Sequence, residues 1–447
     1  MRKTVLTLLI LLAPLALAAQ TSSRADSTAV QAAFLAEDTA QRLVEAGFAN
    51  VRAVRTEDYT VFTVENDAYK IPAEGFARAV EIIEDAGLAG AGRVKIIGTS
   101  YKVPEVTITY NPEVGTWRTT KRLDASWDAV KKQPLLNNSF GKTNINVYPQ
   151  VSLKNLIITQ VYQSLWSLCP TIEVPLWPGA QFSYQVKVPV VNDGYGDIES
   201  YPHPGFITLS QRFRDPWHLN ILGKATVGIF NTTHVGAALE LAYWFPNERF
   251  WVDTKIGVLD LIRFGPSNRA VNGKRLQPPF PEWLVGFWMH PNANPDWRFV
   301  WNIAFNYYCP ALQTQFLLRA ERFVRRDYGL KFEMIRHFRR CSVGFYAMKG
   351  FWESQHTNGG FRFQIALPPF RNARHGYMPR ISTSGQMGMS YNANNEQYYY
   401  QTFRTEASDN IMSKNNYNPY YIDAAVNRSN PNYSREDNAF VRWILGK

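Results

Sequence analysis

The chain has 447 residues, of which 45% are hydrophobic, and its formal net charge at pH 7 is +11. The length is sufficient for two or three domains with sizeable cores. The positive charge accumulates from Lys121 onward without a Lys/Arg cluster or a recognition-helix pattern, so we expect no nucleic-acid partner.

Residues 1–19 have the pattern of a secretory signal peptide. Arg2 and Lys3 precede an apolar run from Val5 to Ala19, and Ala16-Leu17-Ala18 offers a small-x-small cleavage site. The alternative is a short membrane anchor, although the run is short for a helix that crosses a bilayer. No later stretch approaches about eighteen uninterrupted apolar residues. We therefore expect an exported protein that enters a membrane, if at all, through strands.

Residues 20–114 predict a small α/β domain. Apolar positions three and four apart indicate helices, and apolar positions two apart indicate strands. The resulting order is αββαββ, with helices covering one face of a small sheet. Residues 115–141 are polar apart from Trp117 and Trp127 and predict a linker. The predicted helices cover 30–46 and 76–86, and the predicted strands cover 51–55, 59–65, 94–97 and 106–110.

Residues 142–370 alternate between large apolar and polar side chains in long segments. In 299–307, Phe299, Trp301 and Ile303 fall on one side of an extended chain, and Asn302 and Ala304 fall on the other. Strict period two predicts strands. The segments exceed the roughly five or six residues usual in soluble sheets and approach the roughly nine to eleven that a tilted strand needs to cross a bilayer.

Two architectures accept this pattern. A soluble β-sandwich buries the apolar faces between two sheets, whereas a membrane barrel turns them toward lipid. The length of the strands, the export signal and the aromatic residues at strand ends favour the barrel. We expect a mainly β fold, an antiparallel up-and-down transmembrane β-barrel of about 12–14 strands, with the small N-terminal α/β domain attached. The candidate polar and charged contacts in its lumen are Lys224, Glu240, Lys255, Arg319, Glu321, Lys331 and Glu333.

Residues 371–447 are rich in Asn, Tyr and Ser, and alternation survives only near 381–391 and 397–404. Three roles are open for this segment: it completes the barrel, fills the lumen as a plug, or remains outside as a tail. Tyr398-Tyr399-Tyr400 suits either stacking on sugar rings or an aromatic strand.

No pattern indicates catalysis, a metal or a cofactor. The seven histidines have no HExxH or related spacing, and no GxSxG or phosphate-binding glycine loop occurs. Ser342 and His337 stand close enough in sequence to meet, and paired carboxylates for glycoside hydrolysis are not visible from sequence alone. Cys169, Cys309 and Cys341 are widely spaced, and this spacing does not decide whether any two of them form a disulfide. We expect a protein that is not an enzyme.

Several segments resemble the YjbH/GfcD family of outer-membrane β-barrel proteins associated with exopolysaccharide and capsule production. The similar segments include Gly47-Phe48-Ala49-Asn50-Val51, Val64-Glu65-Asn66-Asp67-Ala68-Tyr69, Glu321-Arg322-Phe323, Arg326-Asp327-Tyr328-Gly329-Leu330 and Gly359-Gly360-Phe361-Arg362-Phe363. The resemblance implies a barrel in the outer membrane and an N-terminal domain in the periplasm.

The resemblance also implies a non-catalytic role in the biosynthesis or secretion of an extracellular polysaccharide, through a charged lumen that contacts or conducts the polymer. The expected partners are outer-membrane lipid and lipopolysaccharide, such a polysaccharide, and periplasmic envelope proteins that dock on the N-terminal domain. The alternatives are an outer-membrane scaffold or a general porin-like channel, and an outer-membrane hydrolase is less favoured.

Overall fold

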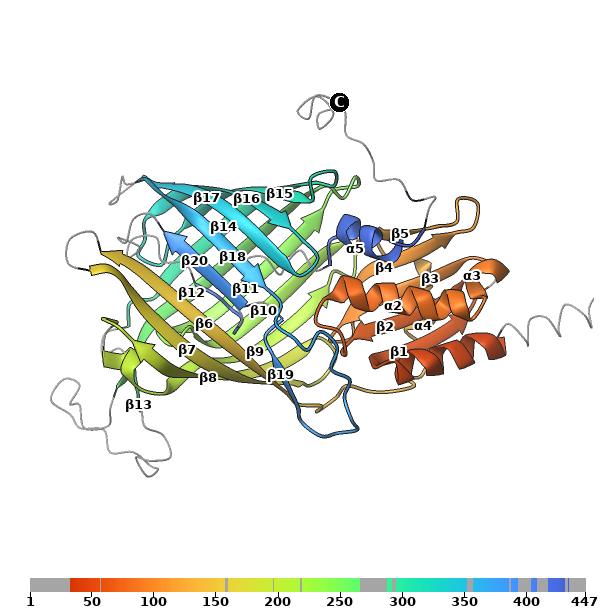
Figure 1. The fold of residues 1–447 in the computed structure, drawn as a ribbon, viewed down its shortest axis with the longest axis horizontal. Helices are drawn as coiled ribbons and strands as arrows, with labels where there is room; N and C mark the ends of the chain where they lie inside the picture. The colour runs from red at the N-terminus through yellow and green to blue at the C-terminus, as the bar shows by residue number, and fades with distance from the viewer. Residues whose placement is uncertain are drawn as a thin grey trace, which may run out of the picture.

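The structure is a computed structural model. It describes residues 33–56, 58–156, 160–195, 197–217, 219–265, 288–291, 295–351, 357–385, 387–392, 403–407, 417–430 and 433. The predicted signal peptide, Tyr398-Tyr399-Tyr400 and the C-terminal end of the chain lie outside these residues. The described chain forms two parts, a small α/β domain and a long sheet that curls around an interior (Figure 1).

The N-terminal domain is a five-stranded sheet in the order β1-β2-β3-β4-β5, in which only β2 and β3 are parallel. Helix α2 begins with Pro72 at its first turn, and its buried positions Phe76, Ala79, Val80 and Ile83 follow helical spacing on the sheet. The elements are a helix at 33–45, β1 (Phe48–Arg55), β2 (Thr60–Asn66), α2 (Pro72–Asp85), α3 (Leu88–Ala91), β3 (Val94–Ser100) and β4 (Val103–Asn111).

Two further elements fall in 115–141, the stretch predicted as a linker. Strand β5 (Thr116–Thr120) pairs with β4, and α4 (Ala125–Val130) covers the face of the sheet opposite α2. Strand β5 is mostly polar, so the alternation of apolar and polar residues did not predict it. Trp117 is nevertheless buried in the core of the domain, so this stretch belongs to the domain rather than linking it to the next part.

The long sheet holds the predicted strands and several that the pattern left unnamed, among them β7, β9 and β17. Fourteen strands follow one another in its hydrogen-bonded path, and β13 pairs beside β12. The strands are β6 (Asn144–Leu156), β7 (Gln160–Pro175), β8 (Ala180–Asn192), β9 (His203–Arg214), β10 (Ile221–Phe230), β11 (His234–Trp244), β12 (Phe250–Gly265), β13 (Trp288–Pro291), β14 (Arg298–Cys309), β15 (Thr314–Arg322), β16 (Tyr328–His337), β17 (Cys341–Gly350), β18 (Thr357–Ile365), β19 (Arg380–Thr383) and β20 (Met387–Asn392).

Both ends of the long sheet bind the same short segment of chain. Strand β19 pairs in parallel with β6, and β20, three residues further on, pairs antiparallel with β18. Between them, the Ser384 N–H donates to the Val147 carbonyl (2.9 Å), and its own carbonyl accepts from the Leu367 N–H (3.1 Å). Residues 380–392 therefore bridge the first and last long strands.

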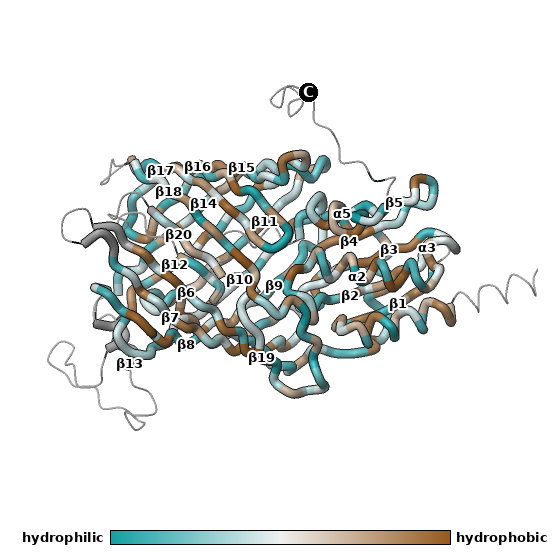
Figure 2. Tube along the Cα trace, viewed as in Figure 1, coloured by the Kyte–Doolittle hydropathy of each residue, from teal (hydrophilic) through white to brown (hydrophobic). Residues whose placement is uncertain are grey.

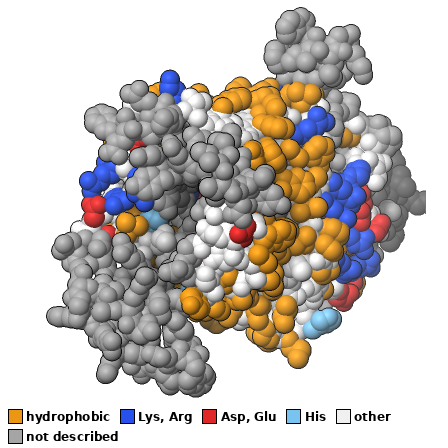
Figure 3. All heavy atoms as spheres, turned by 60° about the vertical axis from the view of Figure 1, so that its left-hand side comes forward, with side chains coloured by type: hydrophobic (Ala, Val, Ile, Leu, Met, Phe, Trp, Pro, Cys, Tyr) orange, Lys and Arg blue, Asp and Glu red, His pale blue; other side chains and the backbone are white. Residues whose placement is uncertain are grey.

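The two faces of the long sheet have the reverse of a soluble protein's polarity. Along β16 every second residue is exposed, and the exposed set includes Leu330, Phe332 and Met334, whereas Lys331 and Glu333 are buried. Figure 2 shows the alternation of apolar and polar residues along the strands, and Figure 3 shows hydrophobic side chains gathered on the outer surface. None of the described helices is long and apolar enough to cross a membrane.

Candidate functional site

Charged and polar side chains gather on the buried face of the long sheet, which we call the interior face. All seven residues predicted to line a lumen are turned away from the exposed apolar face. Because large apolar residues occupy the alternate positions, period two places these charges inside. Lys224, Glu321, Lys331 and Glu333 are buried, and Glu240, Lys255 and Arg319 are half-buried.

The interior contains a second piece of the chain, residues 403–407, which we call the inner segment. The Lys224 ammonium lies 2.5 Å from a Glu406 carboxylate oxygen and donates to the Thr405 hydroxyl (3.2 Å). The Thr405 hydroxyl in turn donates to the Glu240 carboxylate. The Lys255 ammonium donates to the Phe403 carbonyl (3.0 Å). Three of the seven residues predicted to line a lumen therefore bind the inner segment.

Apolar contacts also hold the inner segment. The ring centroids of Phe403 and Phe230 are 6.0 Å apart. Gly257 lies against the Phe403 ring, and a Cβ atom at that position would stand 2.8 Å from its Cζ atom. The buried cluster comprises Phe206, Phe230, Ala238, Leu259, Val300, Val324, Phe403 and Ala407. On the interior side of β9 to β14 the inner segment is thus part of a packed apolar core.

A cavity of about 340 Å³ remains beside the inner segment, and it reaches the N-terminal domain. Arg319 and Glu321 line it together with Lys224, Glu240 and Lys255, so five of the seven predicted residues share one space. Its wall also contains the stacked pair Trp244 and Trp251, whose ring centroids are 6.0 Å apart. From the N-terminal domain and the C-terminal segment it takes Ser100, Glu105, Lys121 and Tyr417.

Lys331 and Glu333 form a separate cluster. Their charged groups lie 3.0 Å apart, and the Arg362 guanidinium of β18 lies 3.5 Å from the same carboxylate. The Lys331 ammonium also stands 4.8 Å from the centre of the Tyr346 ring. Both members of the pair are almost fully buried, so this cluster stabilises the fold only while each charge keeps its partner.

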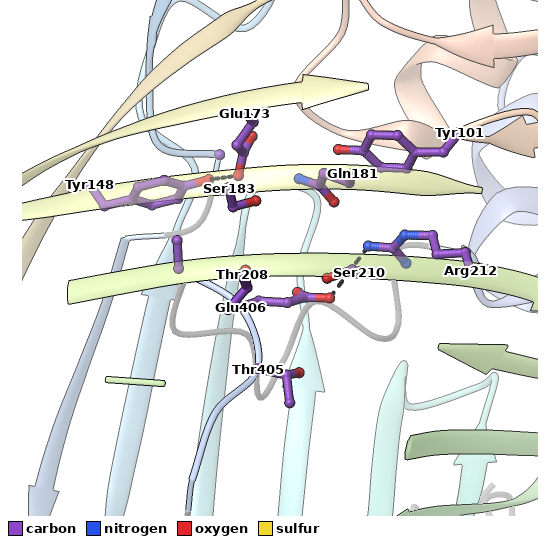
Figure 4. Close-up of a pocket in the computed structure, with 12 residues that line it drawn as sticks. Tyr101, Tyr148, Glu173, Gln181, Ser183, Thr208, Ser210, Arg212, Thr405 and Glu406 are labelled. Atoms are coloured by element: carbon purple, nitrogen blue, oxygen red, sulfur yellow. Dashed lines mark hydrogen bonds and ion pairs between the residues drawn. The ribbon is translucent and has the colours of Figure 1, made fainter. Parts of the chain in front are cut away.

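A second cavity, of about 210 Å³, has a mainly hydroxyl, amide and carboxylate wall (Figure 4). Glu173 accepts from the Asn146 amide (2.6 Å) and the Tyr148 hydroxyl (3.3 Å) on one side. On the other side Arg212 pairs with Glu406 at 3.4 Å. Tyr101, which comes from the turn between β3 and β4, closes the end of this cavity nearest the N-terminal domain.

Glu173, Arg212 and Glu406 were missed by the sequence patterns. For Glu173 a signal exists, because Ser167, Thr171 and Glu173 alternate with exposed apolar residues along β7. Pro170 interrupts the run and obscures it. Glu406 has no such signal, since no alternation with large apolar residues surrounds it, and only the tertiary structure places it inside.

The N-terminal domain covers one end of the long sheet. The Gly179 N–H donates to the Tyr101 carbonyl (2.7 Å), and the Arg214 guanidinium donates to the Pro104 carbonyl (3.2 Å). Lys121 is buried at this junction, 4.5 Å from the centre of the Trp244 ring. Burial lowers the pKa of Lys121 to about 8, and the nearby Glu105 carboxylate opposes that shift.

The Ser/His pair considered from sequence does meet. His337 Nδ1 lies 3.0 Å from the Ser342 hydroxyl, and its Nε2 lies 3.2 Å from the Gln315 side-chain oxygen. In the Ser-His-Asp triad the serine faces Nε2 and a carboxylate faces Nδ1, so this arrangement differs at both nitrogens. Among the residues that the structure describes, no group of His, Cys, Asp or Glu is arranged to hold a metal ion. That the protein is not an enzyme stays a prediction.

No protein-family model matches the chain, and no curated protein matches it. The resemblance to the YjbH/GfcD family thus gains no support from these comparisons. Among solved structures, the chain is similar to two mutants of the Rh. blastica porin, with 7% and 8% identity and a TM-score of 0.27 for each. These matches cover 51% and 56% of this chain and 90% and 98% of the porin chains. At this level the similarity carries no argument about function.

Proposed function

We propose that the protein is an outer-membrane β-barrel whose interior holds a segment of its own chain. The observation that carries this proposal is the reversed burial of the long sheet. Phe305, Phe332 and Phe345 are exposed at mid-strand while Lys331 and Glu333 are buried. Such a continuous apolar surface is unfavourable in water and favourable in hydrocarbon.

The bridging of the sheet ends supports the same proposal. A sheet edge with unpaired N–H and C=O groups is not tolerated in a bilayer, so a spanning sheet must close. The bonds of residues 380–392 to both β6 and β18 support such closure. The expected export signal at 1–19 and the length of the strands favour the outer membrane, where outer-membrane lipid and lipopolysaccharide would surround the barrel.

Extraction behaviour tests the membrane assignment. We expect the protein to fractionate with outer membranes, to resist carbonate extraction and to need detergent for solubility. In unheated gels the folded barrel should migrate differently from the boiled chain. A monodisperse protein that stays in solution without detergent would refute the assignment.

The inner segment supports a resting barrel that is closed, and this favours a scaffold or gated role over a permanently open pore. Lys224, Lys255 and Glu240 are occupied by the inner segment and are not available to a passing polymer. In planar bilayers we expect wild-type conductance well below that of an open barrel. The variant Phe403→Ser/Glu406→Gln should raise it, and Glu113→Gln on the domain surface should not. Open-pore conductance in the wild type, unchanged by the variant, would contradict a closed state.

A role in exopolysaccharide export or assembly is the more specific proposal, and it rests on the sequence resemblance. The cavity shown in Figure 4 adds chemical support, because its hydroxyl, amide and aromatic groups suit a hydroxyl-rich ligand. A strain lacking the protein should lose cell-surface polysaccharide, and the wild-type gene should restore it. Normal polysaccharide in that strain would leave the barrel as an envelope scaffold, with the N-terminal domain docking a periplasmic protein.

A further inference from the structure

The connection between β18 and β19 forms a projecting loop, residues 371–379, fastened at its base. The Arg374 guanidinium donates to the Thr143 carbonyl (3.0 Å) and lies 3.4 Å from the Asp67 carboxylate. The Arg380 guanidinium lies 2.7 Å from the other oxygen of Asp67. Figure 1 shows the loop standing out sideways at the junction between the long sheet and the N-terminal domain, near β19.

The tip of the loop presents large apolar side chains to the outside. Tyr377 is 75% exposed and Met378 is 73% exposed, although the base of the loop is held in place. The loop carries Arg371, Arg374 and His375 and no acidic residue. The Lys142 ammonium stands 5.4 Å from the centre of the Tyr377 ring. The apolar tip therefore lies close to the cationic Lys142, and Arg371 stands exposed at the base of the loop.

The loop lies at the same end of the long sheet as other exposed aromatic residues. The chain turns at this end between β7 and β8, between β9 and β10, and between β11 and β12. Each of these turns carries an exposed aromatic side chain, namely Trp177, Trp217 and Phe245. Aromatic residues at one level of a barrel mark the boundary between hydrocarbon and water. The loop tip adds a further exposed aromatic residue, Tyr377, to this end of the sheet.

We propose that residues 371–379 form a membrane foot in the leaflet nearest the N-terminal domain. Tyr377 and Met378 enter the boundary between headgroups and acyl chains, and Lys142 and Arg371 bind the phosphates of anionic phospholipids. The foot fixes the barrel's depth and, through Asp67, holds the N-terminal domain against the bilayer. This inference rests on the proposed membrane barrel.

Site-specific fluorescence quenching tests the foot. In a background with Cys169, Cys309 and Cys341 changed to Ala, bimane is attached to Met378→Cys, and the protein is placed in nanodiscs of phosphatidylcholine and phosphatidylglycerol. Lipids carrying a nitroxide near the carbonyl should quench this bimane strongly, because an interfacial apolar group sits about 5–10 Å into the headgroup region. Aqueous iodide should quench it weakly.

Two matched labelling positions distinguish a failure of the membrane foot from a failure of the membrane barrel. Phe332→Cys lies at mid-strand on the outer face and reports whether the barrel is in lipid, and Val114→Cys lies in the turn between β4 and β5 and should remain in water. Lipid quenching at 332 and 378 but not at 114 supports the foot. Quenching at 332 alone overturns the foot and keeps the barrel. No lipid quenching at 332 overturns the barrel itself.

The lipid preference has its own measurement. Nitroxide-labelled phosphatidylglycerol should quench bimane-378 more than labelled phosphatidylcholine does, with each basic side chain contributing roughly fivefold in local enrichment. The variant Lys142→Gln/Arg371→Gln should bring the two lipids to equal quenching. Equal quenching already in the wild-type loop would show that the cationic groups select no anionic lipid.

Discussion

At the scale of single residues, the first role of the interior charges of this protein is to stabilise the fold. Lys331 and Glu333 are adjacent across the interior face and nearly inaccessible, and each neutralises the other. Removing one member of such a pair leaves an isolated charge, which costs much more than removing both.

We therefore expect Glu333→Leu to lower the free energy of unfolding by about 3–5 kcal/mol, because Lys331 and Arg362 both lose their carboxylate partner. The triple variant Lys331→Met/Glu333→Leu/Arg362→Met should recover most of that loss, since no charge of this cluster is then left unpaired. Denaturant unfolding in detergent, followed by tryptophan fluorescence, measures both. Lys349→Met, on the exposed side of β17, serves as the control and should change stability by less than about 0.5 kcal/mol. A triple variant no more stable than the single one would contradict the pairing argument.

Gly257 is the residue on which the position of the inner segment depends most directly. A Cβ atom there would approach the Phe403 ring to 2.8 Å, and the two γ-methyl groups of valine would need still more room. We expect Gly257→Val to displace the inner segment and to expose Arg404 to trypsin. Gly90→Val, where an added Cβ meets nothing within 4 Å, is the matched control. Unchanged protection of Arg404 in Gly257→Val would show that the segment is held elsewhere.

At the scale of elements, α5 (Pro419–Val426) completes the edge of the N-terminal sheet. Its Asp423 carboxylate accepts from the Thr119 N–H (2.6 Å), and the Asn427 side chain bonds both the N–H and the C=O of Trp117 at 2.8 Å. These side chains satisfy the outer backbone groups of β5 that a further strand would otherwise pair. A helix far along the chain thus covers an exposed sheet edge.

Burial raises the pKa of Asp423 to about 7, whereas a solvated Asp titrates near 3.9. Between these pH values the docked form binds more protons than the undocked form, so docking weakens as pH rises through this window. The loss in the free energy of docking is at most about 1.4 kcal/mol per pH unit. Hydrogen exchange of α5 amides, corrected for intrinsic rates, should show weaker protection at pH 7 than at pH 5. Asp423→Asn keeps an acceptor for Thr119 and should remove the pH dependence; a persistent dependence would point to another group.

At the scale of the whole molecule, the N-terminal domain is joined to the long sheet by charged contacts. Asp67 holds both Arg374 and Arg380, which are mostly buried, and Glu74 of α2 pairs with Arg339 and Arg340 from the turn between β16 and β17. The domain is therefore fastened to the strands by residues distant in sequence. The proposed membrane foot shares the Asp67 contact, so the domain and the foot move together.

We expect Asp67→Asn to loosen this junction by about 1–3 kcal/mol, because two buried guanidinium groups lose their carboxylate. Trypsin cleavage after Arg374 and Arg380 should become faster, while Asp58→Asn, on an exposed turn, should leave the rate unchanged. Equal rates in all three proteins would mean that the Asp67 contacts do not limit opening of the loop.

The sequence by itself determined most of the long strands and which of their faces is polar, although β7, β9 and β17 were not recognised. Period two is a local property, and a strand such as β16 expresses it without help from the rest of the chain. For the same reason the seven candidate residues could be assigned to one face. The sequence also indicated the α/β character of residues 20–114, although the Thr-rich β5 escaped it.

Only the tertiary structure decided what those interior residues contact. Strand β19 pairs with β6, and the inner segment sits among Lys224, Glu240 and Lys255, because long-range packing brings together parts of the chain about 150 or more residues apart. A polar, irregular stretch has no apolar periodicity from which a position in the interior could be predicted. The pairing of an inner segment with a charged interior is set by shape and charge complementarity in three dimensions, and no local pattern records it.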